Sequence, residues 1–356
     1  MALIAFGAAA VTAIAVPVDE QYYGYFDLKT LACLFCVLAV VCALKNIRFF
    51  YLLAHRIVAR FKNMRLCALA LVYVTFIGSM LIANDMALLT FLPLGYLVLS
   101  VTGKERYMAR LFILQNIAAN LGGMLTPFGN PQNLYLYSKF SIPDGAFIRV
   151  MAPSFLLSIA LFTLCCFLFF KPEAMEVPRE EIRLPAGRTA LYLILFALSI
   201  VMVFRVIPYY VGFFTVLAAL LLADPEALKK VDYPLLLTFA FFFIFAGNMG
   251  RLAPVRELLT SLMEKNPLLV STLSCQVISN VPSAILLSQF TDDWAPLLIG
   301  VNIGGTGTLI ASLASLITFR EYTAHNRGKA GKYILLFSAF NFAFLLILLC
   351  FNLVLR

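Results

Sequence analysis

The sequence predicts an all-α polytopic membrane protein built from two inverted-topology repeats. Of its 356 residues, 62% are hydrophobic and 13% are charged, whereas a soluble domain carries about 25% charged residues. The apolar residues gather in runs of the length that a membrane-spanning helix needs. Polar, helix-breaking stretches interrupt four of these runs, and they form two similar pairs. We therefore expect about nine full spans, with one re-entrant helical hairpin and one broken transmembrane helix in each half.

The uninterrupted spans alternate with short charged segments. Residues 45–65 combine six Lys or Arg with apolar residues at helical spacing, which predicts an amphipathic helix on the membrane surface. Residues 251–265 have the same character in the second half. The charged loop 171–189 holds the expected boundary between the halves. The predicted uninterrupted spans are 2–17, 28–44, 146–170, 189–206, 208–223, 234–249 and 333–354.

The interruptions match between the two halves. "AND" breaks the run 66–101, and "SNVPS" breaks the run 267–290, so that Asn84 pairs with Asn280. Further along each half, "NLGGMLTPFGNPQNL" aligns with "NIGGTGTLIASLASL", with Asn, Gly-Gly, Thr and Leu at matching positions. The first of these copies, residues 120–134, keeps more prolines and amides than its partner, residues 302–316. We therefore expect the more demanding cation site in the first copy.

The positions of Lys and Arg predict the topology. Most of the 27 Lys and Arg fall in loops that lie on one side of the membrane if both hairpins are re-entrant. The positive-inside rule then places the N-terminus in the cytoplasm and the C-terminus outside. It also gives the two repeats opposite orientations. We expect the membrane to be a plasma membrane, such as the inner membrane of a bacterium. The net charge of +9 is explained by loops near anionic lipid, so no nucleic-acid partner is expected.

The interruptions offer groups that bind ions. Broken helices survive in a membrane only inside protein or beside water. Their freed N–H groups attract anions, and their carbonyl, amide and hydroxyl oxygens suit sodium. Asp85 is the one acidic residue well inside an apolar run. It either takes up a proton or neutralises a bound cation, or it caps the second helix of its hairpin.

Other chemistries are not supported by the sequence. An intramembrane aspartyl protease needs two facing carboxylates, and Asp85 has no evident partner, so no enzyme is expected. All eight Cys lie in apolar runs, and the two His, His55 and His325, lie in basic loops. No transition-metal site and no cofactor is therefore expected, apart from a sodium ion.

The motifs "AND" at 83–85, "TPFGNPQN" at 126–133 and "SNV" at 279–281 resemble the ion transporter superfamily. That group includes the citrate and succinate sodium symporters, the arsenite permeases and some sodium/proton antiporters. The Asn-Asp tip resembles the arsenite permeases, and "GNPQN" resembles anion permeases that are called citrate-transporter-like. The resemblance implies a homodimer in which a transport domain moves past a scaffold like an elevator. By the matching motifs, the scaffold is 1–65 and 171–266, and the transport domain is 66–170 and 267–356.

The resemblance also implies a site between the two hairpin tips and the two broken helices. The expected function is secondary transport of a small anion or oxyanion coupled to sodium or protons. The alternative is a sodium/proton antiporter, or an arsenite or antimonite efflux permease, that uses Asp85. The candidate substrate contacts are Asn84, Asp85, Asn133, Ser279, Asn280, Val281, Ser283 and Ser315. The candidate sodium- or proton-coupling residues are Asn84, Asp85, Thr126, Gly129, Asn130, Asn280, Thr308, Ala311 and Ser312.

Overall fold

The computed structural model describes residues 2–176 and 184–355, and in these ranges the chain is helical, with one isolated antiparallel bridge between Asn63 and Ala174. The first half contains α1 (Ala2–Ala15), η1 (Glu20–Tyr25), α2 (Leu28–Asn46), α3 (Phe49–Val58), α4 (Met64–Ile82), α5 (Asn84–Val101), η2 (Glu105–Tyr107), α6 (Met108–Gly122), η3 (Gly123–Leu125), α7 (Pro131–Lys139) and α8 (Asp144–Phe169). The second half contains α9 (Ala186–Val203), α10 (Tyr209–Ala223), α11 (Pro225–Lys229), α12 (Tyr233–Arg251), α13 (Ala253–Lys265), α14 (Pro267–Ile278), α15 (Asn280–Leu287), α16 (Trp294–Ile303), α17 (Leu313–His325) and α18 (Ala330–Leu355).

Seven of these helices are long and apolar enough to cross a membrane. They are α2, α4, α5, α8, α9, α12 and α18. The all-helical, multi-pass prediction is therefore confirmed, while nine full spans and the inverted repeat stay predictions. The expected boundary between the halves lies partly outside the described residues, because the loop 171–189 includes 177–183.

Several elements differ in extent from the sequence prediction. The amphipathic surface helix is only α3, Phe49–Val58, because α2 continues to Asn46 and Arg48 adopts a left-handed conformation that separates the two helices. The first span is also short, since α1 has 14 residues and a full span needs about 20. Side-chain caps set other boundaries: Asn63 starts α4 and Asn266 starts α14 by accepting backbone N–H groups.

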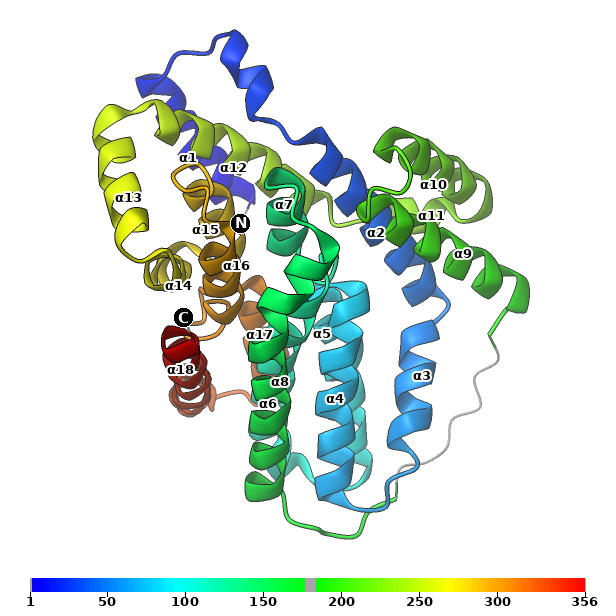
Figure 1. Cartoon of the computed structure of the whole chain (residues 1–356). Helices are drawn as coiled ribbons and strands as arrows, with labels where there is room; N and C mark the ends of the chain where they lie inside the picture. Colours follow the sequence, from blue (N-terminus) through cyan, green and yellow to red (C-terminus); the bar gives the residue numbers. More distant parts are fainter. Residues whose placement is uncertain (1, 177–183, 356) are drawn as a thin grey trace.

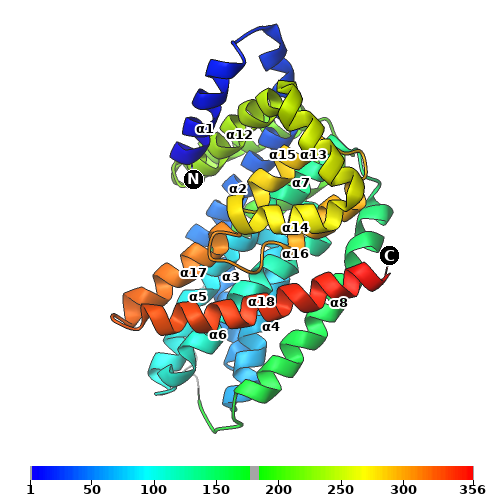
Figure 2. The same cartoon turned by 90° about the vertical axis from the view of Figure 1, so that its left-hand side faces the viewer.

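The helices pack in three neighbouring groups (Figures 1 and 2). The first holds α1 against α12, with α13 leading from α12 to α14. The second holds α9, α10 and α11 against α2. The third surrounds α6, which contacts α4, α5, α8, α17 and α18. Since α6 is buried along almost its whole length, it forms the centre of the molecule and positions the segments that follow it.

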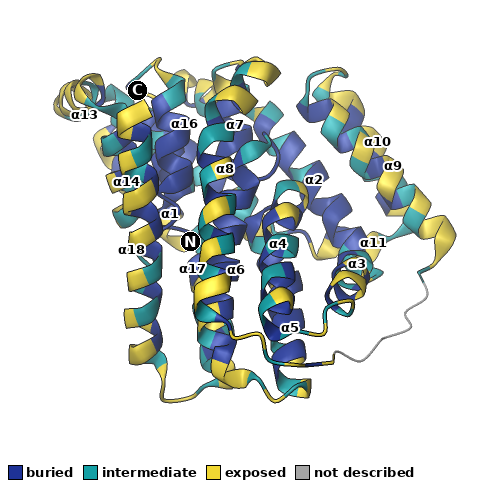
Figure 3. Ribbon diagram, turned by 60° about the horizontal axis from the view of Figure 1, so that its bottom comes forward, coloured by how far each residue is buried: buried dark blue, intermediate teal, exposed yellow. Residues whose placement is uncertain are grey.

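Apolar side chains cover outer faces that the described parts of the chain leave exposed. Figure 3 shows exposed residues along the outer sides of α8 and α18. Leu168 on α8 is 67% exposed, Leu335 on α18 is 75% exposed and Leu222 on α10 is 89% exposed. Exposed apolar faces of this kind are expected where helices meet lipid tails. The fold thus buries a set of polar side chains within an apolar core, while its outer faces are also apolar.

The two predicted hairpins break with the same backbone geometry. Between α4 and α5, Ala83 has φ 62° and ψ 153°. Between α14 and α15, Ser279 has φ 76° and ψ 160°. This region of backbone conformation is essentially reserved for glycine and costs about 1–3 kcal/mol for another residue. Each break is followed by an Asn whose Oδ1 accepts the next backbone N–H, at 3.0 Å for Asn84 and 2.9 Å for Asn280.

The two broken helices are also stabilised in the same way. After α6 the backbone carbonyls of Gly123 and Thr126 accept from Asn133 Nδ2, at 3.0 and 3.3 Å. After α16 the carbonyls of Gly304 and Thr306 accept from Gln276 Nε2, at 2.9 and 3.0 Å. An interrupted helix leaves carbonyls without partners, and unpaired groups are costly in an apolar interior. One side-chain amide at each break, from the buried Asn133 and the half-buried Gln276, supplies the missing donors.

Candidate functional site

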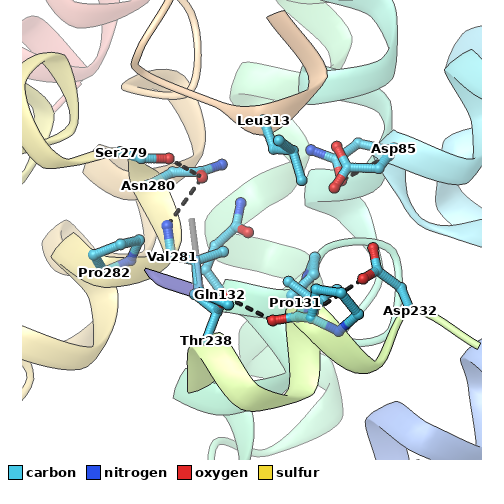
Figure 4. A pocket seen from close by; sticks show the side chains of 14 residues that line it. Asp85, Pro131, Gln132, Asp232, Thr238, Ser279, Asn280, Val281, Pro282 and Leu313 are labelled. Carbon is cyan, nitrogen blue, oxygen red and sulfur yellow. Dashed lines mark hydrogen bonds between the residues drawn. The ribbon is translucent and has the colours of Figure 1, made fainter. Parts of the chain in front are cut away.

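A cavity of about 270 Å³ lies where the interrupted helices meet. The first residues of four helices line it, which are Asn84 of α5, Pro131 of α7, Asn280 of α15 and Leu313 of α17. The start of α12 forms a further wall with Asp232, Leu235 and Thr238. Figure 4 shows how these side chains surround the hollow. The breaks therefore direct several helix N-termini at one volume.

This arrangement gives the cavity a positive backbone potential. A helix N-terminus carries roughly half an elementary charge, and its first N–H groups have no partner within the helix. Four N-termini that converge on one small volume favour an anion or an electron-rich oxygen there. The local strain at Ala83 and Ser279 supports the same interpretation, because strained backbone is concentrated at binding sites.

Acidic and amide side chains also line the cavity, beside the helix N-termini. Asp85 lies in the first turn of α5, and its Oδ1 is buried with no hydrogen-bond partner. Gln132 is 1% exposed, and its Oε1 also has no partner. Asp232 shares the same cavity and caps α12, with Oδ1 accepting from Leu235 N at 2.9 Å. Because both residues line the cavity, their unpartnered oxygens can accept a hydrogen bond or coordinate a cation there.

No Lys, Arg or His is among the described residues that line this cavity. Its formal charges are the two carboxylates of Asp85 and Asp232, and its positive potential comes from backbone alone. An anion would bind here most stably together with a cation or a proton at a carboxylate. The oxygens of Asp85, Gln132, Asn84 and Asn280 are hard ligands of the kind that sodium takes.

A network of amides joins the two halves behind the cavity. Asn84 Nδ2 donates to Asn120 Oδ1 at 3.2 Å, which ties the first hairpin tip to α6. Asn302 Nδ2 donates to Asn133 Oδ1 at 2.6 Å, and its own Oδ1 accepts from Asn130 Nδ2 at 3.2 Å. These bonds join residues far apart in the sequence, and buried hydrogen-bond networks of this kind favour one arrangement. They set the relative positions of the tips and the broken helices.

The structure separates the candidate residues into two sets. Asn84, Asp85, Ser279, Asn280 and Val281 line the cavity together. The others lie behind it and bond to the protein. Asn133, Thr126 and Thr308 bond to backbone carbonyls at the breaks, and Ser283 bonds to Ser274 and Ser315 to Asn116.

The remaining candidates shape the backbone at the breaks. Ala311 accepts from the N–H of Asn280 at 3.0 Å, and Ser312 caps α17. A Cβ on Gly129 would lie 2.4 Å from the carbonyl oxygen of Gly123, so only glycine fits there. Asn130 is the exception among these residues, because its buried Oδ1 has no partner.

Two side chains of the cavity were not predicted from the sequence, although they offer acceptor oxygens beside Asp85. They are Asp232 and Gln132. Asp232 belongs to a short charged loop before a span, where a solvated residue is the ordinary expectation. Gln132 is part of the "GNPQN" motif, but its neighbours Asn130 and Asn133 have the same chemistry and nothing in the sequence distinguishes it. Only the tertiary fold brings the start of α12 against the hairpin tips.

Comparison with known proteins identifies the family. A family model described as a citrate transporter matches residues 1–298. The chain belongs to this citrate transporter family. It is 30% identical over 317 residues to an uncharacterized transporter of Methanocaldococcus jannaschii, which covers 89% of this chain and 86% of that protein. It is 32% identical over 285 residues to the inner membrane protein YbiR of Escherichia coli, covering 76% and 74% of the two chains.

A third relative has a named cargo. The silicon efflux transporter of Oryza sativa is 29% identical over 143 residues, which cover 40% of this chain and 29% of that protein. The family and these relatives confirm the citrate-transporter-like resemblance. This member of the citrate transporter family is therefore a multi-pass membrane transport protein.

Proposed function

We propose that this chain is a secondary active transporter that carries a small anion or oxyanion, coupled to sodium or protons. The observation that carries the proposal is the convergence of four helix N-termini on one cavity that also holds Asp85 and Gln132. The backbone attracts the anion, and the unpartnered oxygens receive the coupling cation or proton. Since an anion bound alone would lie beside two carboxylates, and a cation bound alone would lie beside the helix N-termini, each ligand favours binding of the other.

The mechanism that fits this site is alternating access by an elevator-like movement. The cavity lies between α12 on one side and the hairpin tips and broken helices on the other. In the proposed division, α12 and Ala2 of α1 are part of the scaffold, and the hairpin tips and broken helices belong to the transport domain. Movement of the transport domain past α12 would expose the site on the other side of the membrane. In this proposal the protein is a homodimer, and the contact between the two copies keeps the scaffold still. The dimer lies in a plasma membrane, with each N-terminus in the cytoplasm.

Uptake into proteoliposomes tests this function. With citrate, phosphate and silicic acid as probes, we expect sodium- or proton-driven uptake of at least one of them. Asn84→Ala and Asn280→Ala should each lower the initial rate about 10-fold or more, because each removes a side chain at a hairpin tip. Asn341→Ala is the matched control, since Asn341 is equally buried, lies on α18 outside the cavity lining and, among the described residues, bonds to the Phe337 carbonyl. Unchanged uptake in both tip variants would contradict the assignment of the site.

A second candidate is favoured by Asp85 itself. Its unpartnered oxygen, with Asp232 in the same cavity, also suits sodium/proton exchange or export of a neutral oxyacid such as arsenite. The rice relative is named for efflux of silicon. Asp85→Asn removes the ionisable group and keeps its size. Loss of sodium-induced proton movement in this variant, without any anion uptake by the parent, would favour exchange over symport.

A further inference from the structure

A second hollow, of about 570 Å³, adjoins the central cavity. Its walls come from the end of α2, from α5 and from the segment between α11 and α12. Asp232 and Pro234 line both hollows. We call this second hollow the outer hollow. It meets the central cavity at Asp232, which lies at the right of the central cavity in Figure 4.

The outer hollow is basic where the central cavity is acidic. Lys45 of α2 and Lys230 after α11 both line it, and Asp232 is the carboxylate among its described lining residues. Lys45 makes no ion pair among the residues that the structure describes. Lys230 Nζ donates to a neutral partner, Asn46 Oδ1, at 2.9 Å. Two lysines from separate segments thus line one hollow, and no described carboxylate is paired with either.

The nearby carboxylates have other partners. Glu226 pairs with Lys229 at 2.7 Å. Asp224 caps α11 through Oδ1 and accepts from Tyr192 and from Asn46 Nδ2 through Oδ2, at 3.0 and 3.4 Å. Neither lines the outer hollow. With two lysines and the one carboxylate of Asp232 among its described lining residues, the hollow keeps a net positive formal charge that acts on whatever occupies it.

We propose that Lys45 and Lys230 form an outer anion-binding subsite, which concentrates small oxyanions beside the central cavity. An anion would meet two ammonium groups first and then the carboxylates of Asp232 and Asp85. Movement of the anion from the lysines to these carboxylates is unfavourable unless a cation or proton is already bound to the carboxylate oxygens. Entry of the anion would therefore be coupled to binding of the cation or proton. The passage inward rests on the proposed function, whereas binding of anions at the two lysines does not.

The test reads the charge of the hollow directly and needs no cargo. Leu89 lines the hollow, so Leu89→Cys is a reporter for anionic and cationic methanethiosulfonate reagents of similar size. Cys42, Cys165 and Cys350 are replaced by alanine, because Cys42 lines the same hollow and the other two are not fully buried. We expect the ratio of anionic to cationic labelling rates to fall at least threefold for Lys45→Gln and for Lys230→Gln. Lys45→Arg and Lys230→Arg should keep the ratio of the parent.

Lys229→Gln is the matched control. Lys229 is adjacent in sequence but exposed, paired with Glu226 and absent from the hollow, so its ratio should match the parent. Equal falls for Lys229 and Lys230, no fall for either lysine of the hollow, or no labelling of Leu89→Cys would each overturn the subsite. The measurement in phosphatidylcholine and in phosphatidylglycerol vesicles separates two sources of anion. In one outcome the labelling ratio of the parent falls to that of the lysine variants in phosphatidylglycerol vesicles but not in phosphatidylcholine vesicles. That outcome would assign the subsite to lipid headgroups and contradict a path for small oxyanions.

Discussion

At the scale of single residues, glycines set how closely the broken helices approach the hairpins. A Cβ on Gly122 of α6 would lie 2.0 Å from the carbonyl oxygen of Phe76 on α4. A Cβ on Gly300 of α16 would lie 1.9 Å from Ser271 Oγ and 2.8 Å from the carbonyl oxygen of Leu268 on α14. Small residues let membrane helices pack this closely. Both glycines therefore hold a broken helix against the first helix of its hairpin.

Gly122→Ala should destabilise the protein. The added methyl group meets backbone, which cannot move aside without separating α4 from α6, and overpacking of this kind costs about 1–3 kcal/mol or more. Gly145→Ala is the control, because nothing lies within 4 Å of a Cβ at that position in α8. We expect a lower midpoint of thermal denaturation in detergent for Gly122→Ala, and an equal or higher one for Gly145→Ala. A Gly122→Ala variant as stable as the parent would contradict the close approach.

At the scale of elements, one residue, Glu173, joins three chain segments near the end of α8 through its carboxylate and its backbone carbonyl. Glu173 accepts from Lys104 at 2.7 Å and from Tyr107 at 2.9 Å, and it also pairs with Arg106. Its backbone carbonyl accepts from Met64 at the start of α4. These hydrogen bonds, that of Lys104 first, lower the pKa of the Glu173 carboxyl to about 2. Glu173 thus fixes the ends of α4 and α8 to the linker between α5 and α6.

The pH dependence of stability should report this contact. Because the folded-state pKa lies below the unfolded value of about 4.3, the stabilisation is present above that unfolded value and is lost as the pH falls toward 2. Glu173→Gln should lower the thermal midpoint at pH 7 by a few degrees at most, since the network is partly exposed. The difference between parent and variant should shrink from pH 5 to pH 3. Glu264→Gln, at an exposed position in α13, should show no such pH-dependent difference.

The elements also show how far sequence reasoning reaches. The hairpin tips and broken helices were predictable, because Asn84, Asn280 and the Gly-Gly pairs contradict the apolar pattern around them. The ends of α2 and α3 were not, because the left-handed conformation of Arg48 leaves no mark in the pattern. Nor were Asp232 and Gln132 at the cavity, since their placement depends on packing between segments that are distant in sequence.

At the scale of the whole molecule, contacts between the proposed scaffold and transport domains decide how the site can move. Tyr135 of α7 packs on Phe243 of α12, with ring centroids 5.5 Å apart. Arg205, between α9 and α10, lies over the ring of Tyr137 at 4.1 Å. Within the proposed transport domain, Phe162 of α8 packs on Phe344 of α18 at 5.2 Å. If the two domains move as rigid bodies, the first two contacts must open during a cycle, whereas the third persists.

Reversible cross-linking should distinguish these two kinds of contact. Tyr135→Cys with Phe243→Cys joins the proposed domains, so a mercury bridge should abolish transport, and dithiothreitol should restore it. Phe162→Cys with Phe344→Cys joins two helices of one domain, so the same bridge should leave most of the rate. Each pair is compared with its own rate before mercury, which removes the effect of the substitutions themselves. Continued transport by the bridged Tyr135/Phe243 pair would exclude relative movement of α7 and α12, and with it an elevator that uses this division of the chain.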